Sequence, residues 1–130
     1  MRNRVAGARV ARLATVDAGG RPHLVPFCFV LEGDEVLSAV DAKPKSSRRL
    51  RRLENVRANP TVSVLVDHYE EDWGKLWWVR LDGRAEVVEP GPRSDRALAL
   101  LAGKYRQYLA DRPSGPVLSI HVERWAGWAP

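Results

Sequence analysis

The stretch that decides the fold runs Lys43-Pro44-Lys45-Ser46-Ser47-Arg48-Arg49-Leu50-Arg51-Arg52-Leu53-Glu54-Asn55-Val56-Arg57-Ala58-Asn59-Pro60. Its apolar residues Leu50, Leu53 and Val56 recur every three positions, which predicts a helix with one narrow apolar stripe. Either serine can cap the start of this helix, and Asn59-Pro60 ends it because proline disfavours helix in the residue before it. We therefore expect a helix that docks on the rest of the chain by its apolar stripe.

The same stretch concentrates positive charge. From Lys43 to Arg57 it holds seven basic residues and one acid, so it carries +6, whereas the whole chain of 130 residues carries +5. The free N–H groups at a helix start, two serine hydroxyls and nearby cations together suit a phosphate group. A solvated basic surface and a nucleic-acid site are the alternatives, and we expect no nucleic-acid partner because no aromatic side chains alternate with the arginines.

Length and composition indicate one globular domain over residues 1–130. The chain has 45% apolar and 28% charged residues, which suffices for a small core. It has no apolar run near the roughly 20 residues that cross a bilayer, and residues 1–8 lack the apolar centre of a secretory signal. We expect a cytoplasmic protein without a membrane partner. Cys28, the single cysteine of the sequence, is expected to be a small core residue.

Apolar runs bounded by turn residues predict six strands, over residues 10–16, 22–31, 36–41, 61–67, 76–88 and 117–125. The fifth is long or broken, with a turn or bulge at Asp82-Gly83. Further helices are expected over residues 2–9 and from Ser94, as its cap, to about 109. This order predicts a mainly β fold with flanking helices, an antiparallel six-stranded barrel.

Two features of the predicted strands indicate contacts outside the core. Pro26 lies within a strand but has no N–H group, so it belongs at a sheet edge, at a bulge or beside a ligand. Trp77 and Trp78 are adjacent on one strand and face opposite ways. One is therefore expected in the core and the other at a subunit interface or against a flat ligand.

Standard catalytic motifs are absent from the sequence. It has no Walker A loop and no GxGxxG, HExxH or GxSxG pattern. The histidines are far apart, and the acidic residues 67–72 lack the regular spacing of a calcium loop. We therefore expect no metal site, and we assign no catalytic side chain. An enzyme without such groups can still work if a cofactor performs the chemistry.

Several short pieces of the chain, taken together, resemble a known family. The pieces are Ala11–Val16 with Gly20–Pro26, Lys43–Leu50 with Ala58–Pro60, Val64–Tyr69 with Glu71–Trp73, Leu76–Arg80, Gly83–Ala85 and Gly127-Trp128. Their order is similar to that of the pyridoxamine 5′-phosphate oxidase-like split β-barrels, which bind flavins and deazaflavins. The chain most resembles their small branch of oxidoreductases that use the deazaflavin coenzyme F420.

The resemblance implies a homodimer whose two cofactor sites are shared across the subunit interface. It implies hydride transfer between a small-molecule substrate and non-covalently bound coenzyme F420, an 8-hydroxy-5-deazaflavin, with FMN as the alternative cofactor. A cofactor carrier or haem-binding module without turnover is the non-enzymatic alternative. Oxidation of pyridoxamine phosphate is not expected, because the sequence ends at Pro130 without the Arg-x-His motif of true pyridoxamine phosphate oxidases.

The resemblance also implies which residues hold the cofactor. The phosphate would contact Lys43, Lys45, Ser46, Ser47, Arg48 and Arg49, with Asp41 beside them. The ring would lie against Val25, Pro26 and Phe27. Trp73 or Trp78 would arrive from the partner subunit.

Overall fold

The computed structural model describes residues 1–40 and 47–130, and of residues 47–50 it describes the backbone alone. The strands of this part of the chain are β1 (Ala11–Val16), β2 (Pro22–Phe27), β3 (Val30–Glu32), β4 (Glu35–Ala39), β5 (Thr61–His68), β6 (Trp77–Val88) and β7 (Val117–Trp128). The helices are α1 (Arg2–Gly7), α2 (Ser47–Ala58), the short 3-10 helix η1 (Trp73–Lys75), α3 (Pro92–Lys104) and α4 (Arg106–Ala110).

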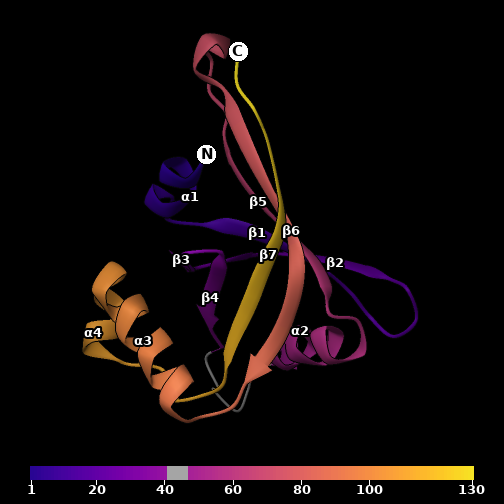
Figure 1. Cartoon of the computed structure of the whole chain (residues 1–130), viewed down its shortest axis with the longest axis vertical. Helices are drawn as coiled ribbons and strands as arrows, with labels where there is room; N and C mark the ends of the chain where they lie inside the picture. Colours follow the sequence, from indigo (N-terminus) through magenta and orange to yellow (C-terminus); the bar gives the residue numbers. More distant parts are fainter. Residues whose placement is uncertain (41–46) are drawn as a thin grey trace.

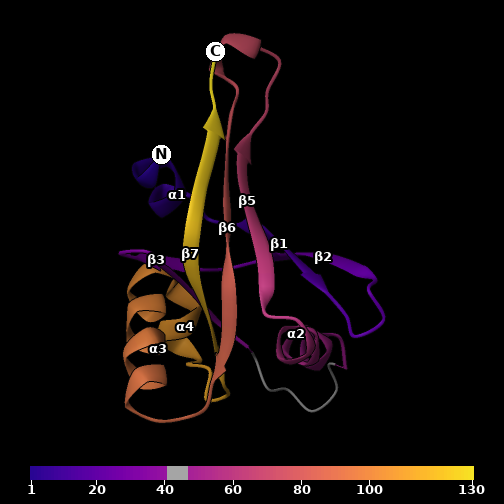
Figure 2. The same ribbon diagram turned by 45° about the vertical axis from the view of Figure 1, so that its right-hand side comes forward.

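All of these strands form one antiparallel sheet in the order β2-β1-β5-β6-β7-β4-β3. The first and last strands in that order, β2 and β3, are separated in the chain by Cys28 and Phe29 alone, so the sheet must curl to bring its two ends together. Helices α3 and α4 lie on one side of the lower half and α2 on the other (Figures 1 and 2). The predicted class, an antiparallel split barrel with flanking helices, is confirmed.

The sheet has seven strands rather than the predicted six because the expected strand 22–31 breaks at Cys28-Phe29. Side chains satisfy the backbone there: Ser38 Oγ donates to the Cys28 carbonyl over 2.9 Å, and Tyr105 Oη accepts from the Phe29 N–H over 3.1 Å. Cys28 is exposed at this break. The expectation that it is a core residue is therefore wrong.

The barrel core lies between the inward faces of the strands. Its fully buried side chains include Leu13, Phe29, Val64, Leu81 and Ile120. The predicted fifth strand is continuous, and its register shifts at the bulge between Asp82 and Gly83. A Cβ atom at Gly83 would lie 2.1 Å from the His121 carbonyl oxygen, so the close approach of β7 requires glycine at the bulge.

The helices follow the sequence pattern with two corrections. Helix α2 ends at Ala58 as predicted, and Leu53 and Val56 of its stripe are buried. Helix α3 begins at Pro92 rather than being capped by Ser94, because proline suits the first helical position and Gly91 is the cap. Ser94 lies one turn in, where its hydroxyl bonds both the N–H and the carbonyl of Gly91.

The second correction concerns the end of that helix. The predicted helix to about residue 109 is interrupted at Tyr105, whose backbone is extended. The Tyr105 hydroxyl lies within hydrogen-bond distance of the carbonyls of Phe29 (2.9 Å) and Arg9 (3.0 Å), which share its one proton and lie far away in sequence. No helix within the described residues is long and apolar enough to cross a bilayer.

Candidate cofactor-binding site

A cavity of about 320 Å³ lies where the end of β2 meets the end of β4, α2 and α4. It is lined by Pro26, Phe27, Cys28, Ser38, Ala39, Val40, Arg52, Gln107 and Tyr108. The cavity therefore joins an apolar strand end to one face of the basic helix.

Strand β2 supplies two of the residues predicted to line a cofactor ring. Pro26 and Phe27 line the cavity, and Val25 packs against the barrel core. Within the described residues β2 pairs with β1 alone, with Pro26 opposite Arg12, so of the three predicted placements of Pro26 the structure shows the sheet edge. An edge strand leaves one row of backbone groups open, and this open edge beside apolar side chains suits a flat ring with polar rim atoms.

Helix α2 supplies the positive charge at the cavity. Arg52 lines it, while Arg51 and Arg57 are exposed on other faces of the helix. Val40, the last described residue before α2, also lines the cavity. Of the predicted phosphate-binding set, Asp41, Lys43, Lys45 and Ser46 lie outside the described residues. Ser47, Arg48 and Arg49 form the start of α2, where the backbone alone is described.

Trp73 and the cavity lie at opposite ends of the β5–β6 hairpin. Trp73 is in η1, 77% exposed, beyond the end of β5, whereas α2 ends just before β5 begins (Figure 1). The eight residues of β5 span roughly 25 Å. Within one chain the structure therefore does not bring Trp73 to the residues that line the cavity.

Trp78 lines a second and larger hollow, a groove of about 530 Å³ on the outer face of the sheet. The groove is lined by Arg12, Ala14, Leu24, Ser63, Val64, Leu65, Asp67, Tyr69, Trp78 and Arg80. Trp77 packs instead against the core and stacks on His68. The prediction that the two tryptophans face opposite ways is confirmed.

The charged groups of the groove are ion-paired, Arg12 with Asp67 inside it and Arg80 with Asp82 beside it. Arg12 Nη1 lies 3.1 Å from Asp67 Oδ1, and Arg80 Nε lies 3.0 Å from Asp82 Oδ1. Burial alone would raise the pKa of Asp82, but hydrogen bonds from Ser63 and Arg80 hold it below its ordinary value. Because these charges are compensated, the surface that the groove offers to a ligand or a second chain is mainly apolar and aromatic.

Sequence reasoning missed part of both hollows. It did not assign Ser38, Gln107 and Tyr108 to the cavity, and it named Arg52 only as part of the basic stretch. It also missed Leu24 and Leu65 in the groove. None of these positions carries a local pattern, since strand order and helix packing together bring them to the two hollows. One signal was available: Leu24 and Pro26 are two residues apart on β2, so they lie on the same, outward face of the strand.

Comparison with known proteins identifies the family. The family model described as pyridoxamine 5′-phosphate oxidase matches residues 1–129. The chain therefore belongs to the pyridoxamine 5′-phosphate oxidase family, as the sequence pieces predicted.

Individual relatives share different parts of the chain. A 5a,11a-dehydrotetracycline/5a,11a-dehydrooxytetracycline reductase of Streptomyces rimosus is 35% identical over 86 residues, 65% of this chain and 59% of that protein. The chain thus matches about three fifths of this relative's length. The structure of an FAD-binding protein from Mesorhizobium loti is 25% identical, with a TM-score of 0.72 over 97% of this chain and 87% of that one. The heme storage protein of Vibrio cholerae has the same fold at 20% identity, with a TM-score of 0.71 over 98% and 90% of the two chains.

Proposed function

We propose that this protein is an oxidoreductase that transfers hydride through non-covalently bound coenzyme F420, with FMN as the alternative cofactor. The observation that carries the proposal is the cavity in which the open edge of β2 meets the basic helix α2. Similarity to a reductase and to an FAD-binding protein supports the same class of chemistry.

The ring of the cofactor would lie against Pro26 and Phe27. These side chains would exclude water from one face, and the edge of β2 that is unpaired within the described residues would offer backbone donors and acceptors to the polar rim of a pyrimidine-like ring. The phosphate would be held by the predicted set of Lys43, Lys45, Ser46, Ser47, Arg48 and Arg49, which leads into and begins α2.

The extent of positive charge favours the deazaflavin over FMN. FMN needs one phosphate cradle, whereas coenzyme F420 also carries an acidic tail. Helix α2 carries exposed Arg51 in addition to Arg52 at the cavity, with Glu54 as its one acid, whereas Arg57 near its end is paired with Glu89 over 3.0 Å. This surplus of basic side chains suits a second anionic group.

The second half of the proposal is a homodimer with shared sites. Leu24, Tyr69, Trp73 and Trp128 are all exposed in the single chain, and Leu24 and Tyr69 flank the apolar groove. Burying such side chains against a second copy is favourable. Because Trp73 is remote from its own cavity, the partner's Trp73 or Trp78 is the one that would cover the cofactor.

The protein's own contribution to the reaction is binding and orientation. The bound deazaflavin supplies the carbon that accepts or donates hydride. The chain's residues hold its phosphate, fix its ring against β2 and keep water from one face, so that a small-molecule substrate meets it in a productive geometry. No side chain is proposed as acid, base or nucleophile.

A parallel fluorescence titration with coenzyme F420 and with FMN tests this function, with light scattering on the same sample. We expect micromolar or tighter binding of the deazaflavin and a mass twice that of one chain. Preference for FMN would move the protein to the alternative cofactor. Binding of neither, or a monomer that binds cofactor fully, would contradict the shared-site proposal.

The non-enzymatic alternative is a cofactor carrier or haem binder. The reason to test it is that the heme storage protein of Vibrio cholerae has the same fold. A screen of quinones, enones and tetrapyrroles with the loaded protein separates the two. Tight cofactor binding without reduction of any acceptor would favour the carrier.

A further inference from the structure

Helix α2 is joined to the first strand by a buried polar contact. Asn55 Nδ2 donates a hydrogen bond to Thr15 Oγ1 over 3.1 Å, and the two residues are 4% and 3% exposed. Two residues near Asn55 on α2, Leu53 and Val56, are apolar and buried. A buried amide needs a partner in a defined place, so this contact fixes where the helix sits, whereas apolar contacts tolerate sliding.

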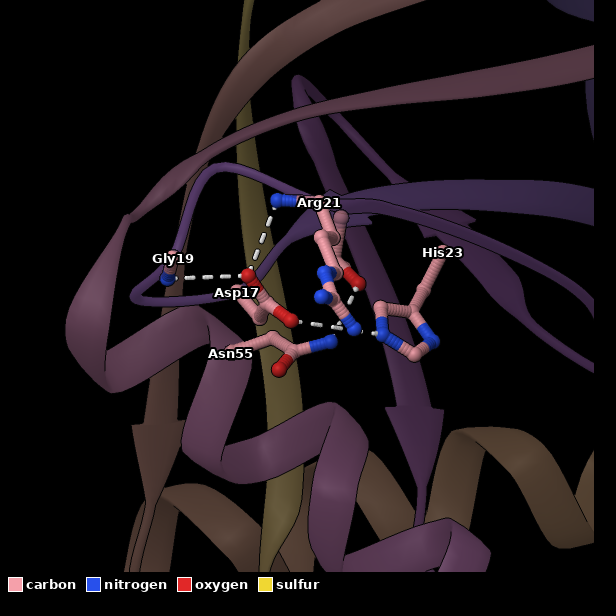
Figure 3. Close-up of polar contacts among 6 residues, drawn as sticks. Asp17, Gly19, Arg21, His23 and Asn55 are labelled. Carbon is pink, nitrogen blue, oxygen red and sulfur yellow. Dashed lines mark hydrogen bonds and ion pairs between the residues drawn. The ribbon is translucent and has the colours of Figure 1, made fainter.

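The strand side of the contact belongs to the β1–β2 hairpin. Thr15 lies opposite His23 in the pairing of β1 with β2. At the turn, Asp17 Oδ1 accepts hydrogen bonds from the N–H groups of Gly19 and Arg21, each over 2.9 Å, and Asp17 Oδ2 lies 3.7 Å from His23 Nε2 (Figure 3). The Arg21 N–H is the main cause of the lowered pKa of Asp17. The turn is therefore held by its own carboxylate.

The contact joins the two elements that carry the proposed cofactor site, α2 and the β1–β2 hairpin. Two residues beyond His23, β2 reaches Val25, Pro26 and Phe27, the segment proposed to line the ring. Eight residues before Asn55, α2 begins at Ser47, and eight helical residues span roughly 12 Å. A fixed Asn55 therefore fixes the distance from the start of α2 to the β2 segment.

We propose that Asn55 is a positioning residue: its hydrogen bond to Thr15 sets the spacing between the phosphate end of the cofactor site at α2 and the ring end at β2. The inference rests on the proposed function. A cofactor that binds both ends at once gains affinity because the second contact is intramolecular, and this gain depends on correct spacing. Loss of the spacing should weaken binding of the whole cofactor and leave binding of the ring alone unchanged.

The test variant is the double substitution Thr15→Val with Asn55→Leu. It removes the bond without leaving a buried polar group unpaired, so the fold should survive. Thr15→Ser is the matched control because it keeps the hydroxyl. Circular dichroism and thermal unfolding check that each variant is folded.

The measurement compares dissociation constants for FMN and for riboflavin, which lacks the phosphate. If the wild-type chain binds only the deazaflavin, coenzyme F420 and its phosphate-free chromophore are the pair. We expect the double variant to bind the phosphate-bearing member at least about tenfold more weakly, with the ring-only member within about twofold and Thr15→Ser like wild type.

Three outcomes would overturn the inference. Unchanged affinity of the folded double variant for the whole cofactor would show that the bond does not set the spacing. Equal losses for both members of the pair would show a general structural role. Failure of the wild-type chain to bind any of the four probes would overturn the proposed function together with this inference.

Discussion

Helices α2 and α3 cover opposite sides of the lower half of the barrel and are held to it in different ways (Figure 2). Helix α3 buries Ser94, Ala97, Leu98, Leu101 and Ala102, and its first turn is closed by the bonds of Ser94 to Gly91. The described side chains of α2 bury less apolar surface, and its buried Asn55 bonds Thr15.

The sequence around the two helix starts differs in charge. Arg93, the second residue of α3, is paired with Glu86, which raises the pKa of Arg93. Arg48 is the second residue of α2 and follows a segment rich in lysine. We therefore expect α3 to contribute mainly stability and α2, under the proposed function, to present charge to a ligand.

The largest effect that separates the two helices should come from Leu101→Ala. Leu101 is fully buried, so the substitution removes apolar contacts and leaves a cavity. We expect the free energy of unfolding to fall by about 2–5 kcal/mol, with cofactor affinity of the folded protein unchanged. Urea unfolding measures the first and titration the second. Leu109→Ala, at an exposed leucine of α4, is the control and should change neither quantity. A weaker cofactor affinity of folded Leu101→Ala would contradict the view that α3 contributes to stability and not to binding.

A smaller, pH-dependent effect should come from Lys104 at the end of α3. Its Nζ donates to the Phe29 carbonyl over 2.9 Å, and burial, followed by the charge of Arg9, lowers the pKa of Lys104 from 10.5 to about 8. Between pH 8 and 10.5 the unfolded chain therefore holds more protons on this group than the folded chain. The contribution of Lys104 to stability is least favourable below pH 8 and improves as pH rises through that window.

The measurement is the unfolding free energy of the native sequence minus that of Lys104→Met, at pH 7 and pH 9.5. Both proteins should carry Cys28→Ser, because the Cys28 thiol is coupled to Lys104. We expect this difference in unfolding free energy to be larger at pH 9.5 than at pH 7. The increase should be smaller than the loss caused by Leu101→Ala, because solvent screens a half-exposed amine. A flat or falling difference would show that Lys104 is not desolvated in the folded chain.

Local patterns predicted most of the fold. The apolar stripe of α2, the turn residues and the β-branched run of β5 each act over a few residues, so the sequence contains their signal directly. The breaks at Cys28-Phe29 and at Tyr105 were missed because each depends on the other. The Tyr105 hydroxyl bonds the Phe29 backbone from 76 residues away, and no local period reports such a contact.

The candidate site was predictable at its strand end and less so elsewhere. Pro26 lacks an N–H, which indicated the edge of the sheet, and the structure confirms it. Gln107 and Tyr108 reach the cavity because α4 packs near the end of β4, a consequence of topology rather than of pattern. Asn55 gave no signal, since a polar residue beside the apolar stripe of a helix is ordinary until its buried partner is known.

The most direct test of the central claim is the cofactor affinity of Lys45→Ala and Arg48→Ala, with Arg93→Ala as the control at the matching position of α3. Each lost charge-assisted bond should cost about 1.5–3 kcal/mol, a loss of about 10- to 150-fold in affinity for the phosphate-bearing cofactor. Arg93→Ala should bind like the native protein. Unchanged affinity in both test variants, or an equal loss in the control, would contradict a phosphate site at the start of α2.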